Sequence, residues 1–155
     1  MGERSPINDT NARGTFIGMT MDTSRADLVQ AVLEGVAFAI RDSFEVAKKL
    51  GLSITASNIC GGGSKSPLWK TIFANVLGIP LNILKTEQGP GYGGAMLAMV
   101  GCGQFDSVQA AADALVAVAD TVQPDAELTA RYEQRYQQFQ KIYPACKDLF
   151  AALKA

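Results

Sequence analysis

The stretch Ser57–Trp69, which reads SNICGGGSKSPLW, decides how the rest of the chain is interpreted. Ser57–Cys60 is typical of a short buried strand, and the glycines of Gly61–Gly63 form a turn directly after it. Ser66 is a favourable helix N-cap and Pro67 a favourable first helical residue, so the stretch predicts a strand–turn–helix unit. Glycines let a ligand approach the backbone, and a helix N-terminus favours an anion such as phosphate. A turn that serves backbone geometry alone is an equally good interpretation.

A long helix is expected before this unit. Thr23 and Ser24 are candidate N-caps, Asp27 completes a capping box with Ser24, and Gly51 ends the helix after Leu50. The helix is expected to be buried on more than one side, because apolar residues recur along it at helical spacing. These residues are Leu28, Val32, Val36, Ile40 and Phe44, with Val29, Leu33, Ala37 and Ala47 beside them.

Two residues inside this helix carry expectations of their own. Gly35 costs about 1 kcal/mol relative to alanine in a helix interior, so a neighbouring element is expected to approach it closely. Glu34 falls among apolar neighbours, and solvent exposure of its carboxylate is the expectation because charged side chains are rarely buried.

Strands and helices alternate through most of the chain. Before the long helix, Thr15–Met19 predicts a strand or an extended packing segment. After the strand–turn–helix unit we expect a strand at Leu81–Leu84, a helix from about Gly93 to Val100, another capped by Asp106 or Ser107, and a last helix from Pro124 and Asp125 to Leu153, kinked at Pro144. This order predicts a helix-rich α/β fold with a parallel sheet. So few strands suggest the end of a domain whose first strands lie elsewhere, since a mean sheet has about five or six.

Composition excludes several classes of function. The 155 residues fit one domain, 48% of them are apolar, and the net charge is -1, so no basic field exists for nucleic acid. The chain has no histidine, which excludes a histidine base, a Ser-His-Asp triad and a histidine-ligated metal within it. Three scattered cysteines favour reduced thiols and a cytoplasmic protein, and a polar N-terminus without a long apolar run predicts neither a signal peptide nor a membrane span.

A second glycine cluster, GPGYGG at Gly89–Gly94, matches the letters of a dinucleotide-binding fingerprint. Four residues separate it from the preceding strand, whereas the fingerprint needs its glycines directly after one. Close helix packing through Gly93, Gly94, Ala95 and Ala98 is therefore the favoured interpretation. Aromatic residues on the last helix, from Tyr132 to Tyr143, are expected to belong to a core or an interface rather than to bind a ligand. Trp69 is likewise expected to pack, on the sheet, rather than to flank a ligand.

The chain resembles the C-terminal end of the FGGY carbohydrate kinases, most closely the xylulose kinases. Gly14–Met19 together with Asp27–Glu34 is similar to the C-terminal signature of that family, and MGERSP and NARG resemble the loop before it. GGGSKSPLW at Gly61–Trp69 resembles the adenosine-site loop, and EQGPGYGGAMLA at Glu87–Ala98 a later glycine loop and helix. Asn75 stands where many relatives have Asp, which is expected to be a helix-surface change. Tyr92 replaces a smaller residue.

This resemblance implies part of an actin-like (ribonuclease H-like) ATPase domain over residues 1–155. It implies ATP-dependent phosphorylation of a sugar, D-xylulose to D-xylulose 5-phosphate, with ATP and Mg²⁺ in a cleft between two domains. By the same resemblance, Gly61, Gly62 and Gly63 would line the nucleotide, and Ser66 would make a polar contact near the adenine. No residue here is assigned as the catalytic base or as a metal ligand.

A full family member is roughly three times as long, so the sugar site and the general base are expected elsewhere. We therefore expect this chain alone to be an inactive nucleotide-binding part. An open sheet edge predicts self-association, most simply as a homodimer. A non-catalytic interaction domain is the alternative, and a dinucleotide-binding piece of an oxidoreductase is less favoured.

Overall fold

The computed structural model describes residues 2–86 and 89–153, and these form two compact units. The first comprises Met1–Ile54, Asn75–Gly78 and Asp125–Ala155, and the second comprises Thr55–Ala74 and Ile79–Pro124. The resulting fold is helix-rich α/β with few strands, as expected.

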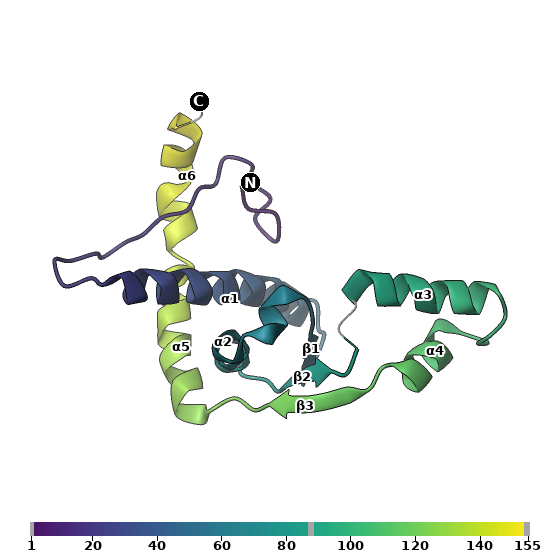
Figure 1. Ribbon diagram of the computed structural model, residues 1–155. Coiled ribbons are helices and arrows are strands. Elements are labelled where there is room, and N and C mark those ends of the chain that lie inside the picture. The colour runs from purple at the N-terminus through teal and green to yellow at the C-terminus, as the bar shows by residue number, and fades with distance from the viewer. Residues whose placement is uncertain (1, 87–88, 154–155) are drawn as a thin grey trace. The chain divides into compact units, whose positions relative to one another are not determined.

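The second unit is built on a three-stranded sheet with the order β1-β2-β3 (Figure 1). β1 (Ser57–Ile59) pairs in parallel with β2 (Leu81–Leu84), which confirms both strand predictions. β3 (Val118–Val122) was not predicted, and it pairs antiparallel to β2, so the expectation of a purely parallel sheet is wrong. Its sequence, VADTV, lacks the continuous apolar run of a buried parallel strand, because β3 lies at an edge and its first three residues are exposed.

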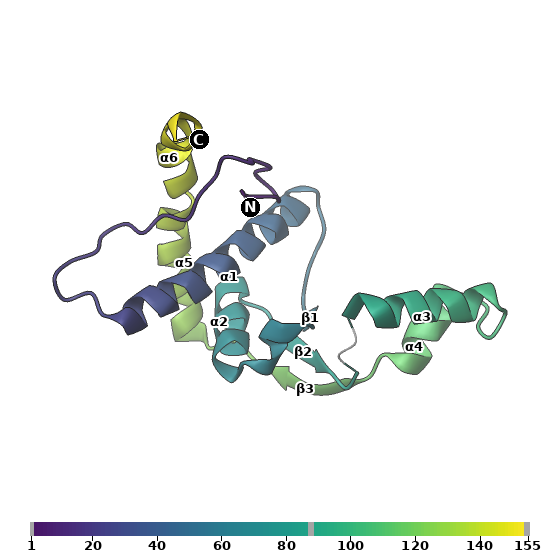
Figure 2. The same ribbon diagram turned by 45° about the horizontal axis from the view of Figure 1, so that its top comes forward.

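Helices of the second unit follow most of the expected capping signals. α2 (Pro67–Leu77) begins at the predicted proline, and Ser107 caps α4 (Val108–Leu115) by accepting a hydrogen bond from the backbone N–H of Ala110 at 3.1 Å. α3 (Gly89–Gly101) lies beside α4, as Figures 1 and 2 show.

α3 begins about four residues earlier than predicted, so the second glycine cluster is helical and forms no loop. This removes the turn that a dinucleotide fingerprint requires. The expected close packing is also wrong for Gly93 and Gly94, because no described atom lies within 4 Å of a Cβ placed on either one. Glu87 and Gln88, which open the family-like segment here, lie outside the described residues.

The first unit packs α1 (Arg25–Lys49) against α5 (Ala126–Phe139), which cross in both views (Figures 1 and 2). The predicted capping box is present, since Ser24 and Asp27 each satisfy a backbone N–H of the other. Phe38 lies at the centre of an aromatic core, with ring centroids 5.2 Å from Phe139 and 6.0 Å from Tyr132 and Tyr136. Tyr132, Tyr136 and Phe139 of the aromatic stripe thus pack in the core, as expected, whereas Tyr143 belongs to α6 and donates its hydroxyl proton to Asp9 at 2.8 Å.

The predicted last helix is two helices, because α5 ends at Phe139 and α6 (Ile142–Ala152) begins three residues later. Pro144 has no N–H for the carbonyl of residue 140, and its ring clashes with that carbonyl in a continuous helix. A kink was expected at Pro144, but the chain breaks in the turn that precedes it.

The buried side of α1 differs from the predicted one. Val32, Val36 and Ile40 are exposed although they were expected to be buried, and Ala37 is buried as expected. Glu34 and Phe38, which lay outside the predicted face, are buried. No described atom of a neighbouring element lies within 4 Å of a Cβ placed on Gly35, so the expected close approach is absent. Thr15–Met19 forms no strand, and its apolar side chains are exposed rather than packed.

Candidate functional site

The glycine turn after β1 continues as a short 3₁₀ helix, Gly62–Lys65. Gly61 has φ +86°, a backbone conformation that side-chain-bearing residues rarely adopt. Its carbonyl accepts hydrogen bonds from the N–H of Ser64 at 3.1 Å and from the hydroxyl of Ser64 at 2.7 Å. The buried Ser64 side chain therefore stabilises the conformation of the turn.

Gly63 is needed for packing. A Cβ at this position would lie 2.8 Å from a ring carbon of Trp69, so any larger residue would displace the indole. That indole in turn lies against Phe73, with ring centroids 5.5 Å apart. Trp69 therefore packs within the chain, as expected.

Neither the backbone conformation nor the packing of this chain requires a glycine at position 62. Its φ is not in the left-handed region, and no described atom lies within 4 Å of a Cβ built on it. The residue is exposed, and the space above its backbone is open. Of the three glycines, Gly62 is the one whose lack of a side chain leaves room for a ligand rather than for this chain.

Ser66 caps α2 as predicted, because its hydroxyl oxygen accepts a hydrogen bond from the N–H of Trp69 at 3.3 Å. Its own N–H donates to the carbonyl of Gly63 at 3.2 Å, which ties the cap to the turn. The structure thus brings Gly61, Gly62, Gly63 and Ser66 together at one helix N-terminus. Pro67 has no N–H and the N–H of Trp69 is already bonded to Ser66, so this end offers a ligand chiefly the partial positive charge of the helix, which favours phosphate.

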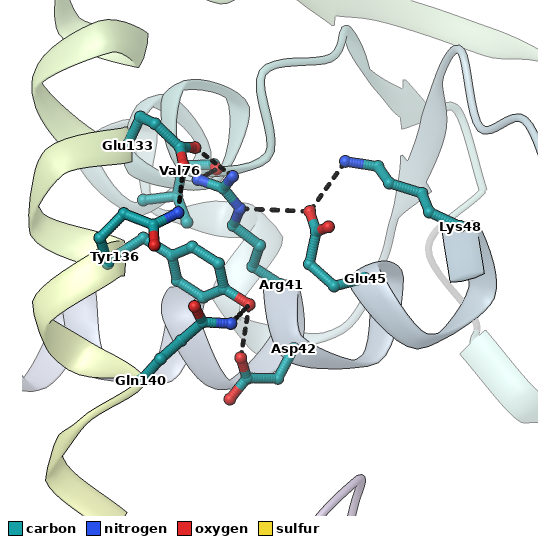
Figure 3. A network of polar contacts seen from close by, with 9 residues as sticks. Arg41, Asp42, Glu45, Lys48, Val76, Glu133, Tyr136 and Gln140 are labelled. Atoms are coloured by element: carbon teal, nitrogen blue, oxygen red, sulfur yellow. Dashed lines mark hydrogen bonds and ion pairs between the residues drawn. The ribbon is translucent and has the colours of Figure 1, made fainter.

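The first unit contains a separate polar network that the sequence analysis did not predict (Figure 3). The guanidinium of Arg41 donates to the carbonyl of Val76 at 3.2 Å, pairs with Glu133, and lies 4.0 Å from the ring centre of Tyr136. The Tyr136 hydroxyl donates to Asp42 at 2.5 Å and accepts from Gln140 at 2.9 Å. Burial, and then the hydrogen bond to Asp42, hold the Tyr136 pKa well above its usual value.

Carboxylates at the edge of this network are held in the charged form. A hydrogen bond from Lys48 lowers the pKa of Glu45, with a further contribution from Arg41. The side chain of Gln137, and then Arg41, lower the pKa of Glu133. Only the pair of Arg41 with Glu133 joins α1 to α5 through charge, because the contacts of Glu45 lie within α1 and that of Gln137 lies within α5.

Glu34 is buried, which corrects the expectation of solvent exposure. Its carboxylate accepts hydrogen bonds from Gln30 at 2.8 Å, Tyr132 at 3.0 Å and Arg135 at 3.0 and 3.1 Å. Burial of Tyr132 and its bond to Glu34 raise the pKa of that phenol. A buried carboxylate is tolerated here because its oxygens are paired.

Asn75 is also buried, so its assignment to the helix surface was wrong. Its side-chain oxygen accepts a hydrogen bond of 2.7 Å from the backbone N–H of Asp125, the N-cap of α5. Either an amide or a carboxylate oxygen can accept this bond. Tyr92, the other departure from the family pattern, donates its hydroxyl to the carbonyl of Leu115 at 2.9 Å.

Within residues 2–86 and 89–153, no group of three or more cysteine, aspartate or glutamate side chains is arranged to hold a metal ion. All three cysteines are free thiols. Over the same ranges, none of the helices combines the length and apolar character needed to cross a membrane.

Comparison with known proteins identifies relatives of the whole chain. Residues 1–102 match the profile described as the FGGY family of carbohydrate kinases, C-terminal domain. A protein named xylulose kinase from Bacillus subtilis (strain 168) is 34% identical over 155 residues, which cover 100% of this chain and 31% of that protein. The chain therefore spans about a third of the length of the curated relatives that it matches.

Solved structures agree with this match. The crystal structure of a xyloylose kinase from Brucella ovis has a TM-score of 0.82 and 34% sequence identity. The match covers 93% of this chain and 30% of that chain. The crystal structure of a ligand-bound xylulose kinase from Lactobacillus acidophilus has a TM-score of 0.85 and 24% sequence identity. The match covers 97% of this chain and 31% of that chain. The fold is thus that of the FGGY sugar kinases, which is an actin-like ATPase fold.

Proposed function

Because the chain belongs to the FGGY family of carbohydrate kinases, we propose that it is the nucleotide-binding part of an ATP-dependent sugar kinase. Its reaction would convert D-xylulose to D-xylulose 5-phosphate, which the names of the relatives support. In this proposal the chain covers a minority of the enzyme, and the sugar site and general base belong to the remainder.

The exposed backbone of Gly62 carries the assignment of the nucleotide site. A ligand can reach this backbone because no described side chain covers it, while Gly61 and Gly63 are held by conformation and by Trp69. Gly61, Gly62 and Gly63 would line the ATP, and Ser66 would contact the adenine or its surroundings. When bound, ATP supplies the phosphoryl group, and Mg²⁺ offsets the charge that develops as it transfers.

The role of this chain in such a reaction is to bind and orient. Phosphoryl transfer depends chiefly on positioning and on charge stabilisation, and holding two reactants in place accounts for about 7–11 kcal/mol of a barrier. The turn supports positioning because the hydrogen bonds of Ser64 and the cap at Ser66 fix its backbone before any ligand arrives.

The test uses a chimaeric kinase, called here the chimaera, in which this chain replaces the matching segment of the Bacillus subtilis xylulose kinase. ATP binding is measured by calorimetry for the chimaera and for its Gly62→Val variant. We expect the variant to fold, because the new side chain meets open space, and to bind ATP at least about tenfold more weakly, a difference of about 1.4 kcal/mol.

Gly101→Val is the matched control, since Gly101 is also exposed and also has no described atom near a Cβ. It should leave ATP affinity unchanged. Equal affinity of a folded Gly62→Val variant would refute the site.

A further inference from the structure

Two strands end side by side at the edge of the sheet where the glycine turn begins. β1 and β2 are parallel, and their last register pair is Ile59 with Ile83 (Figure 1). Gly61 and Lys85 each follow this pair by two residues, one after each strand, so both lie at the carboxyl edge of the parallel pair. Neighbouring strands lie about 4.8 Å apart, which places the backbone of Lys85 close to that of the turn. In open α/β sheets this edge is where ligands bind.

Lys65 lies on the open side of the same turn. It is the last residue of the 3₁₀ helix Gly62–Lys65, in which side chains three residues apart lie one above the other. Its side chain therefore leaves the turn on the side of Gly62. No described atom lies within 4 Å of a Cβ built on Gly62, so that side is open. The ammonium group of Lys65 can thus reach a ligand that rests on the Gly62 backbone.

The charges of the two lysines are not offset by the described residues. Both side chains are exposed, and neither ammonium group forms an ion pair with a carboxylate in residues 2–86 or 89–153. The sequence of the second unit contains three cationic residues, and two of them are at this edge, the third being Lys70 on α2. Asp120, the one carboxylate on the described strands, is on β3, which pairs with β2 and not with β1. The described part of this edge therefore has a local positive charge, although the whole chain has a net charge of -1.

We propose that Lys65 and Lys85 bind the phosphate chain of the nucleotide and hold it over the backbone of Gly62. The inference rests on the proposed function and extends it, because it assigns the phosphates rather than the adenine to this edge. A di- or triphosphate carries several negative charges along its length, so two cations on neighbouring segments can contact it at once. Adenine is neutral and gains nothing from either ammonium group. Lysine binds phosphate as a point charge, so these contacts need no fixed side-chain geometry before the ligand arrives.

The experiment measures the binding of ATP, ADP and adenosine to the chimaera and to its variants Lys65→Gln and Lys85→Gln. Titration calorimetry gives the affinities for ATP and ADP, and competition against ATP gives that for adenosine. Each variant should bind ATP and ADP about five- to tenfold more weakly, because one charge-assisted contact is lost at a solvent-exposed site. Adenosine has no phosphate, so its affinity should stay the same. Lys65→Arg and Lys85→Arg keep the charge and should bind ATP nearly as well as the unsubstituted chimaera.

Lys49→Gln is the matched control, since it removes the same charge from another exposed lysine, at the end of α1 in the first unit. It should leave all three affinities unchanged. Unchanged ATP affinity in a folded Lys65→Gln or Lys85→Gln variant would overturn the proposal. Equal weakening of ATP and adenosine would also overturn it, because the lysines would then support the nucleoside or the fold. Equal weakening by Lys49→Gln would assign the effect to net charge and would overturn the proposal as well.

Tripolyphosphate, which has the phosphate chain without the nucleoside, gives a second measurement. It should compete with ATP for the chimaera and compete at least about fivefold less well for both glutamine variants. No competition with the chimaera would overturn the proposal. The result is separable from the proposed function: a chimaera whose ATP binding depends on Gly62 but on neither lysine refutes only this inference, whereas a chimaera that binds no ATP refutes the proposed function and this inference with it.

Discussion

Removal of the Tyr136 hydroxyl should reveal how strongly the polar network holds α1 to α5. In the variant Tyr136→Phe the ring keeps its place against Phe38, while the bonds to Asp42 and Gln140 are lost. A hydrogen bond to a charged group contributes about 1.5–3 kcal/mol and a neutral one about 0.5–1.5 kcal/mol. Because Gln140 is exposed and Asp42 is half-buried, water replaces part of both bonds, so we expect a loss of about 2 kcal/mol near pH 7.

The same variant should change how stability depends on alkaline pH. The folded-state pKa of Tyr136 is raised above its unfolded value of about 10, so the folded chain keeps this proton after the unfolded chain has lost it. The contribution of this phenol to stability is complete below about pH 10 and is lost as pH rises toward the folded-state pKa. Between pH 10 and the folded-state pKa, each pH unit lowers the unfolding free energy of the wild type by about 1.4 kcal/mol through this phenol. The phenylalanine variant has no phenol at this position and shows no such loss.

Urea unfolding followed by far-UV circular dichroism, at several pH values from about 7 to 11.5, tests both parts. The difference in unfolding free energy between the wild type and Tyr136→Phe should be constant up to about pH 9 and nearly vanish by about pH 11.5. Gln140→Ala is the control, since it removes one bond and keeps the phenol, so it should retain the alkaline slope of the wild type. A difference that stays constant across the whole range would refute the raised pKa, and one below about 0.5 kcal/mol at pH 7 would refute the network.

Asn75→Ala should lower the unfolding free energy by about 1–3 kcal/mol, because the N–H of Asp125 loses its buried acceptor, whereas Asn75→Asp keeps an acceptor and should cost less. Urea unfolding measures both, and equal losses would contradict the acceptor role. The isolated chain should release no ADP in response to D-xylulose with ATP and Mg²⁺, because a positioned base alone supplies about 10²–10⁴-fold of rate and none is assigned here. A coupled ADP-release assay beside the chimaera checks this, and sugar-dependent turnover by the isolated chain would contradict it.

Local signals predicted the elements that depend on a few neighbouring residues. The capping box of Ser24, the cap at Ser66 and the left-handed Gly51 act within four residues, so they could be recognised without knowledge of the fold. The same holds for β1 and β2, which are short segments followed by turn residues. β3 and the early start of α3 lacked such signals, because an exposed edge strand tolerates Asp120 and a helix of glycines looks like a loop.

Long-range polar contacts could not be predicted, because no local pattern records them. Arg41 and Glu133 are 92 residues apart, and Asn75 and Asp125 are 50 apart. The resemblance to a family located the glycine turn, but it gave no indication that Asn75 is buried. Only the fold shows that this side chain accepts a hydrogen bond from the backbone N–H of Asp125, the N-cap of α5.

The two sides of α1 explain why a correct helix prediction gave an incorrect burial prediction. Of the face that periodicity selected, Val32, Val36 and Ile40 are exposed, while Ala37 is buried together with Glu34. Apolar spacing indicates which sides of a helix avoid water, but it does not indicate which of those sides the 155 residues of this chain cover. The buried side of α1 bears Glu34, whose carboxylate accepts hydrogen bonds from Tyr132 and Arg135 on α5. The exposed side, with Val32, Val36 and Ile40, has no charged group that could make such bonds.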